Sequence, residues 1–187
     1  MFIPAIVCLA LAQIAQQPNP EQPTPPAPPA QRQVVLSSLP DEWMGEWRGT
    51  LHIADRNVQI PMGLDIRPVE GRDAWTWRLT YGEQPAREYT LVATERKGRF
   101  VLDENNGILL DMRLDERTMH SVFGVGEIMI VSRYELTDDG ALVNEIITIA
   151  TGSPRTSEVR DAPAGSPVER VDSHLVTGRQ RAVMRKQ

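Results

Sequence analysis

The sequence predicts an all-β protein, an antiparallel up-and-down β-barrel of about ten strands, and three observations support this. Apolar and polar residues alternate through most of the chain after residue 34, which is the period of a strand with one buried face. Turn sequences such as Asn106-Gly107 and Asp138-Asp139-Gly140 separate the alternating runs at short intervals. No run in this region keeps a 3.6-residue apolar period, so we expect no long helix.

Four runs show the alternation most clearly. In these runs nearly every second residue is apolar, and most of the residues between them are polar. The four apolar sides are Val58, Ile60, Met62, Leu64 and Ile66; Trp75, Trp77, Leu79 and Tyr81; Ile108, Leu110, Met112 and Leu114; and Ile128, Ile130, Tyr134 and Leu136. Sequential strands joined by tight turns close into a barrel or pack as a two-sheet sandwich. The absence of an obvious crossover connection favours the barrel.

Two segments depart from this pattern. Residues 152–169 (GSPRTSEVRDAPAGSPVE) are rich in turn-forming residues and predict one long loop. Residues 37–44 (SSLPDEWM) are compatible with a single helical turn before the first strand.

The first 33 residues of the chain predict export. Residues 1–12 (MFIPAIVCLALA) have the apolar run and the small-x-small ending of a signal peptide, although no Lys or Arg precedes the run. The alternatives are an uncleaved anchor and an N-terminal strand. Residues 13–33 are proline-rich and predict a disordered or extended tether, because proline lacks an amide donor and fixes φ. The barrel is expected over 34–187. We expect a periplasmic or secreted protein, with the tether as a route to cell-envelope association.

Composition and motifs argue against several functions. The net charge of −5 shows no basic excess, so we expect no nucleic-acid partner. The apolar run at 1–12 is too short to span a bilayer, and the mature chain has no other candidate span. No nucleophile motif or carboxylate pair is apparent, so no enzyme activity and no cofactor are expected. The histidines lack metal-ligand spacing, and Cys8 is the only cysteine, so no metal site is expected.

An aromatic stripe gives the first candidate binding residues. Trp75, Trp77 and Tyr81 share one strand face, where they either fill the barrel or line a cavity in it. Asn144 and Thr148 lie on the inward face of a later strand and would add polar groups to an apolar pocket. These five residues are the predicted ligand-binding set, and a small apolar molecule is the expected ligand.

The sequence Gly45-Glu46-Trp47 at the start of the first strand resembles the Gly-x-Trp motif of lipocalins and related calycins. In those barrels an arginine near the last strand stacks on the tryptophan and closes one end. The resemblance therefore implies a calycin-like barrel in which Gly45 permits a tight entry turn and Arg181 or Arg185 lies over the Trp47 ring.

The longer sequence Gly45-Glu46-Trp47-Arg48-Gly49 is also similar to the opening of nitrobindins. Nitrobindin-type barrels bind haem through a histidine near their C-terminal strands. The resemblance implies His174 as the only metal-ligating candidate, and only if the protein binds haem.

Four functions stay open from the sequence. The leading one is an exported lipocalin- or calycin-like barrel that binds or carries a small hydrophobic ligand. The first alternative is a tethered, non-enzymatic scaffold or interaction domain whose barrel is filled by its own side chains. The further alternatives are a haem-binding, nitrobindin-like barrel and an enzyme on the same fold, which would need a polar cleft with strongly shifted titrating groups. The volume of the interior should separate the first two.

Overall fold

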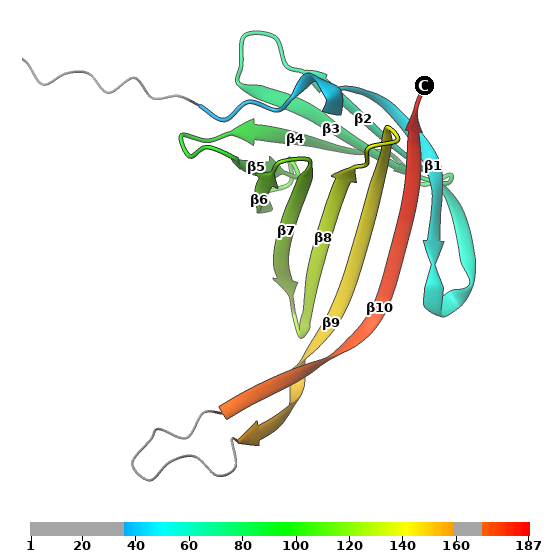
Figure 1. Ribbon diagram of the computed structural model, residues 1–187, viewed down its shortest axis with the longest axis vertical. Helices are drawn as coiled ribbons and strands as arrows, with labels where there is room; N and C mark the ends of the chain where they lie inside the picture. Colours follow the sequence, from blue (N-terminus) through cyan, green and yellow to red (C-terminus); the bar gives the residue numbers. More distant parts are fainter. Residues whose placement is uncertain (1–35, 159–169) are drawn as a thin grey trace, which may run out of the picture. The chain divides into compact units, whose positions relative to one another are not determined.

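Ten antiparallel strands close into a barrel in the computed structural model, which describes residues 36–158 and 170–187 (Figure 1). Each strand pairs with its neighbours in sequence, and the first pairs with the last, so the predicted all-β up-and-down barrel is confirmed. The strands are β1 (Gly45–Ile53), β2 (Val58–Pro68), β3 (Ala74–Tyr81), β4 (Arg87–Ala93), β5 (Arg99–Asp103), β6 (Leu109–Asp115), β7 (Thr118–Val125), β8 (Ile128–Leu136), β9 (Ala141–Glu158) and β10 (Arg170–Lys186), with short 3-10 turns η1 (Asp41–Trp43) and η2 (Ala54–Arg56).

The signal peptide predicted at 1–12 and the tether predicted at 13–33 lie outside the described residues. The described strands all belong to one unit, Val34–Gln187. Within the two described ranges, no helix is long and apolar enough to cross a membrane.

The seam between β1 and β10 closes the barrel, and it depends on a glycine. Gly49 is paired with Met184. A Cβ atom added to Gly49 would lie 2.1 Å from the Val183 carbonyl oxygen, far inside contact distance. Only a residue without a side chain permits this approach of the two backbones.

Trp43 fills one end of the barrel, which we call the closed end. The η1 turn places its indole in the interior with an exposed fraction of 0%, and its ring centroid lies 6.5 Å from that of Trp77. The Trp47 Nε1–H donates to the Trp43 carbonyl at 2.9 Å, which ties the turn to β1. The side chains of Leu39, Phe100, Met119 and Leu142 are also almost fully buried in the same hydrophobic core. This end is therefore packed with the chain's own side chains.

The residue that stacks on Trp47 is Lys186, and neither arginine expected there does so. The Lys186 ammonium lies 5.1 Å from the centroid of the Trp47 ring, because Lys186 is paired with Trp47 in the seam. Arg181 and Arg185 would share the inward face only if Val183 also faced inward, because strand residues alternate. In the structure Ala182 and Met184 are fully buried, whereas Val183 is 40% exposed.

Arg181 and Arg185 therefore face outward. The Arg185 guanidinium binds the Asp139 carboxylate at 2.7 Å, and Arg181 is an exposed residue paired with His52. Three successive apolar residues, Ala182-Val183-Met184, do not define which parity faces inward, and this misled the sequence argument. The barrel is compatible with a calycin-like fold, but the implied arginine stack is replaced by a lysine.

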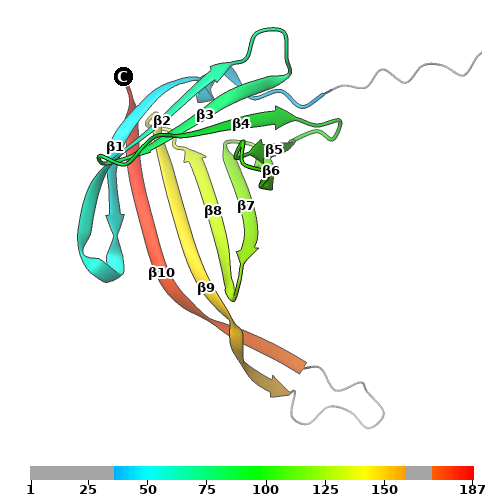
Figure 2. The same cartoon turned by 180° about the vertical axis from the view of Figure 1, so that it is seen from behind.

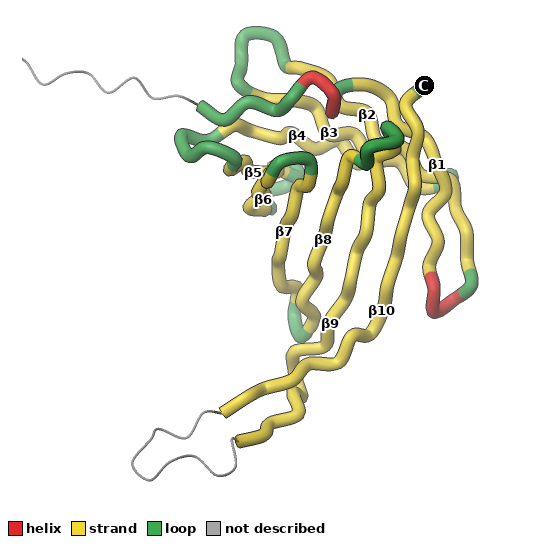
Figure 3. The backbone as a smooth tube through the Cα atoms, viewed as in Figure 1, coloured by secondary structure: helices red, strands yellow, loops and turns green. Residues whose placement is uncertain are grey.

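The loop predicted at 152–169 is partly strand. β9 continues to Glu158 and pairs with β10 from Arg170, so the two form a ribbon that extends past the ends of β7 and β8 (Figures 1 and 2). β8 pairs with β9 only as far as Ala150. We call the extension, residues 151–158 and 170–174, the arm. Figure 3 shows it as continuous strand outside the barrel.

Replacing Gly49 by alanine should test the seam directly. We expect Gly49→Ala to lower the free energy of unfolding by about 1–3 kcal/mol or more, because a methyl group would overlap the β10 backbone. Chemical denaturation monitored by tryptophan fluorescence measures this.

The matched control is Gly124→Ala in β7, where the added Cβ meets only the Ile128 carbonyl oxygen, at an ordinary 3.8 Å. This control should change stability by less than about 1 kcal/mol. Equal effects of the two substitutions would contradict the close approach at Gly49.

Candidate functional site

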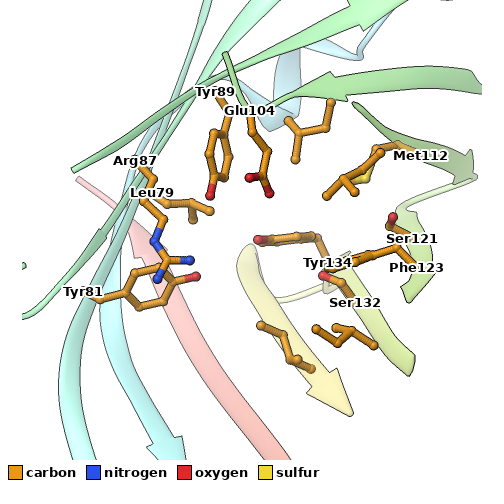
Figure 4. Close-up of a pocket in the computed structure, with 14 residues that line it drawn as sticks. Leu79, Tyr81, Arg87, Tyr89, Glu104, Met112, Ser121, Phe123, Ser132 and Tyr134 are labelled. Atoms are coloured by element: carbon orange, nitrogen blue, oxygen red, sulfur yellow. The ribbon is translucent and has the colours of Figure 1, made fainter. Parts of the chain in front are cut away.

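All three tyrosines of the chain meet at the end of the barrel opposite Trp43, which we call the open end. Tyr81 ends β3, Tyr89 lies near the start of β4, and Tyr134 lies inside β8. Figure 4 shows their rings arranged around one space, with the Tyr134 hydroxyl directed into it. Each occupies an inward-facing position of its strand, so the alternation that builds the core also brings the phenols together.

The three phenols border a cavity of about 100 Å³. Most of its wall is apolar, and the remaining lining groups are hydroxyls and two charged side chains. The lining residues are Leu79, Tyr81, Arg87, Tyr89, Leu102, Glu104, Leu110, Met112, Ser121, Phe123, Ile130, Ser132, Tyr134 and Ile146.

Two opposite charges lie at the rim of the cavity. Arg87 places its guanidinium carbon 5.0 Å from the centroid of the Tyr81 ring, within the range of a cation–π contact. Glu104 follows β5 at the same inward parity as Phe100 and Leu102, which turns its carboxylate toward the phenols (Figure 4). Among the described residues, this carboxylate accepts one side-chain hydrogen bond, from the Asn106 amide at 3.2 Å.

A buried serine holds the wall together where two strands separate. Only residues 113–115 of β6 pair with β7, where their partners are residues 118–120. The paired ladder therefore ends before the cavity. The Ser121 hydroxyl donates to the Asp111 carbonyl at 2.8 Å and bridges the two strands beyond that point. The hydroxyl oxygen therefore keeps acceptor capacity at the cavity wall.

Burial raises the pKa of two of the phenols. Desolvation raises the pKa of Tyr134 far above its usual value, and the neighbouring Tyr81 phenol adds to this effect. Desolvation also raises the pKa of Tyr81, while the Arg87 charge opposes the shift. At neutral pH both groups are uncharged hydroxyls that donate and accept hydrogen bonds.

Of the five predicted ligand-binding residues, only Tyr81 lines the cavity. Trp77 is fully buried and packs edge-to-face against Tyr134 at 5.1 Å, and Trp75 packs against Phe100 at 5.9 Å. β3 runs from the closed end to the open end, so its tryptophans lie deep in the core and only its last residue reaches the cavity. Alternation gives the face of a residue but not its height in the barrel.

The predicted polar groups are also placed elsewhere. Asn144 is fully buried and donates from its side-chain amide to the Arg133 carbonyl at 3.3 Å, while its Oδ1 atom has no partner among the described residues. Thr148 shares hydroxyl contacts with Thr177 and Gly178 on β10. Neither side chain lines the cavity.

Tyr89, Tyr134 and Glu104 were missed as site residues. Tyr134 was expected on the inward side of its strand, and the chain's tyrosines are few enough that their shared inward parity was a usable signal. Glu104 gave no signal, because an acidic residue before an Asn-Gly turn is typical of a solvated loop.

The residues present do not fit haem. His174 is exposed on the arm and does not line the cavity, and a cavity of about 100 Å³ is far too small for a porphyrin. Within residues 36–158 and 170–187, no three His, Cys, Asp or Glu side chains are grouped as metal ligands.

No protein-family model matches this chain, and no curated protein matches it closely enough to indicate a relationship. The fold and the site together define the class of the protein as a ten-stranded up-and-down barrel with a packed closed end and a small aromatic cavity at its open end.

Alkaline pH should reveal the buried phenols. The pKa values of Tyr81 and Tyr134 are raised in the folded protein above the unfolded value of about 10. As the pH rises, the unfolded chain therefore loses these two protons before the folded protein does. Stability should therefore be unaffected by them below about pH 10 and should fall as the pH rises above it.

The near-ultraviolet absorbance of tyrosinate measures this, and every tyrosine it reports lies at the cavity. In denaturant we expect the phenols to ionise with a midpoint near pH 10, whereas in the folded protein the part of the signal from Tyr81 and Tyr134 should appear only at higher pH. Tyr134→Phe should remove part of the delayed signal. Reversible ionisation of Tyr81 and Tyr134 in the folded state with a midpoint near pH 10 would contradict their burial.

Proposed function

We propose that this barrel binds a small amphipathic molecule at its open end. The observation that carries the proposal is the cavity of about 100 Å³, where apolar side chains surround a few convergent polar groups. Such a combination allows a pocket to bury the apolar part of a ligand and to orient it through hydrogen bonds.

The cavity volume limits how much of the ligand is enclosed. Pockets that bury a whole drug-sized ligand measure roughly 300–1,000 Å³, whereas an engineered cavity of about 150 Å³ accepts benzene. A cavity of about 100 Å³ therefore suits a group of a few heavy atoms. The ligand inserts one end between the phenols and leaves the remainder at the rim. A large cargo enclosed in the barrel, as in many lipocalins, does not suit this volume.

Export remains part of the proposal and is supported by the sequence alone. The signal-like residues 1–12 and the proline-rich residues 13–33 would carry the barrel out of the cytoplasm and hold it at the cell envelope. Binding would then occur in the periplasm or outside the cell.

Filling the cavity should abolish binding. We expect 3,3-dimethylbutan-1-ol and cyclohexanol to bind the purified protein weakly, as measured by saturation-transfer-difference NMR. Ser132→Phe places a ring in the cavity and should remove the signal, because the volume of about 100 Å³ is then occupied.

Ser173→Phe, on the exposed arm, is the matched control and should leave binding unchanged. Thermal denaturation should show that both variants fold. Undiminished binding by the Ser132→Phe protein would place the ligand elsewhere and reject the proposed site.

An interaction domain is a second candidate function, and the arm favours it. β1 pairs with β10 only from Gln180 onward, so among the described strands the outer edge of β10 over 170–179 has no partner. The other free edge, on β9, contains Pro154, which cannot donate to a neighbouring strand. The β10 edge also carries Leu175 and Val176, which are 71% and 57% exposed. A strand edge of this kind pairs with another strand.

The occupant we propose for that edge is β10 of a second copy, paired antiparallel about a two-fold axis. Sedimentation velocity at a protein concentration of about 100 µM should then show dimers, because we expect a weak dimer with a dissociation constant of about this size. A Leu175→Lys, Val176→Lys protein should be monomeric, whereas Val122→Lys, at an exposed position of β7, should still dimerise. A monomeric wild-type protein at this concentration would exclude the pairing.

A further inference from the structure

The cavity contains an acidic side chain that lacks a cationic partner. Glu104 is half-buried and lines the cavity, and among the described residues no Lys, Arg or His nitrogen lies within 4.0 Å of its carboxylate. Its one side-chain hydrogen bond comes from the neutral amide of Asn106. A carboxylate that borders an apolar cavity is stabilised by a positive charge brought close to it.

The other groups around this carboxylate also favour a cation. The cavity wall includes the rings of Tyr89, Tyr134 and Phe123, and aromatic faces carry the negative part of the ring quadrupole. The phenol oxygens can accept hydrogen bonds, and the Ser121 hydroxyl already uses its proton on the Asp111 carbonyl. Figure 4 shows the Tyr89 hydroxyl and the Glu104 carboxylate on the same side of the space, facing the Tyr134 hydroxyl.

One cationic side chain also lines the cavity, and its position matters. The Arg87 guanidinium stacks on Tyr81 at the rim, where Arg87 is exposed, and it makes no ion pair with Glu104 within 4.0 Å. It therefore leaves the carboxylate uncompensated while it opposes the entry of another positive charge. The two rim charges should act on a cationic ligand with opposite signs.

From this arrangement we propose that the ligand group bound between the phenols is an organic ammonium ion, with Glu104 as its counter-ion and the aromatic rings as its cage. This rests on the proposed function, because it specifies the chemistry of the group that the same cavity binds. A methylated ammonium group has only a few heavy atoms, which suits a cavity of about 100 Å³. Aromatic cages that recognise methylated ammonium groups use the same physical interaction.

Two probes of equal shape test the charge. Choline carries a trimethylammonium group, and 3,3-dimethylbutan-1-ol carries a neutral tert-butyl group in its place. We expect the wild-type protein to bind choline at least about tenfold more tightly than the alcohol, measured by NMR titration at constant ionic strength.

Variants that neutralise one of the two rim charges should change the affinity for choline in opposite directions. Glu104→Gln should weaken choline binding by about tenfold and leave the binding of the alcohol unchanged, whereas Arg87→Gln should strengthen choline binding. Glu83→Gln removes the same charge at an exposed position in the β3–β4 turn outside the cavity lining, and it should have little effect. A purely structural role of Glu104 would weaken both probes together.

The outcomes separate this inference from the proposed function. Equal or tighter binding of the alcohol would overturn the ammonium assignment and leave a cavity for neutral ligands. Binding of neither probe to the wild-type protein would reject both the ammonium assignment and the open-end binding site. Choline binding that is unchanged in both the Glu104→Gln and Arg87→Gln proteins would also overturn the assignment, because the cation would then lie away from the cavity.

Discussion

The pairing of β1 with β10 is the constraint on which the rest of the structure depends. It joins the first strand of the described barrel to the last, and it leaves neither barrel edge open over the paired residues. Gly49 permits the two backbones to approach where any side chain would meet the Val183 carbonyl. Because the sheet is closed, all inward-facing side chains share one interior of fixed volume. The size of the side chains at each level along the barrel axis therefore decides whether the barrel is filled or hollow there.

The two ends of the barrel differ in how completely side chains fill them. At the closed end Trp43 enters from outside the sheet, and Trp47 and Trp77 complete a core without room for a ligand. Toward the open end β6 and β7 separate and serines replace larger side chains at Ser121 and Ser132, which leaves a cavity of about 100 Å³. The filled end supplies stability. The open end keeps hydroxyl groups and a carboxylate without a cationic partner among the described residues, a combination typical of binding sites.

Sequence reasoning predicted the barrel because strand alternation and turn residues are local properties. The Asn106-Gly107 turn and the inward parity of Tyr81 and Tyr134 needed no knowledge of the rest of the chain. The candidate site needed more, because alternation assigns Trp77 and Tyr81 to the same face although one lies in the packed core and the other at the cavity. The last strand shows a second limit: three consecutive apolar residues gave no parity, so the arginines were placed inside and Lys186 was overlooked. Depth and register arise from long-range pairing, which a single sequence does not display.

The central claim is that binding occurs at the open end while the closed end is a filled core. The aromatic residues divide so that one experiment reports on both, because all three tyrosines lie at the cavity and Trp43, Trp47 and Trp77 lie in the buried core. Protein labelled with ¹³C in its tyrosine rings and ¹⁵N in its tryptophan indoles should be titrated with choline. We predict saturable shifts of the tyrosine ring signals with nearly constant signals from the indoles of Trp43 and Trp47, whereas the Trp77 indole, which touches Tyr134, is not used as a reporter. Saturable binding that leaves the tyrosine signals unmoved would contradict the claim.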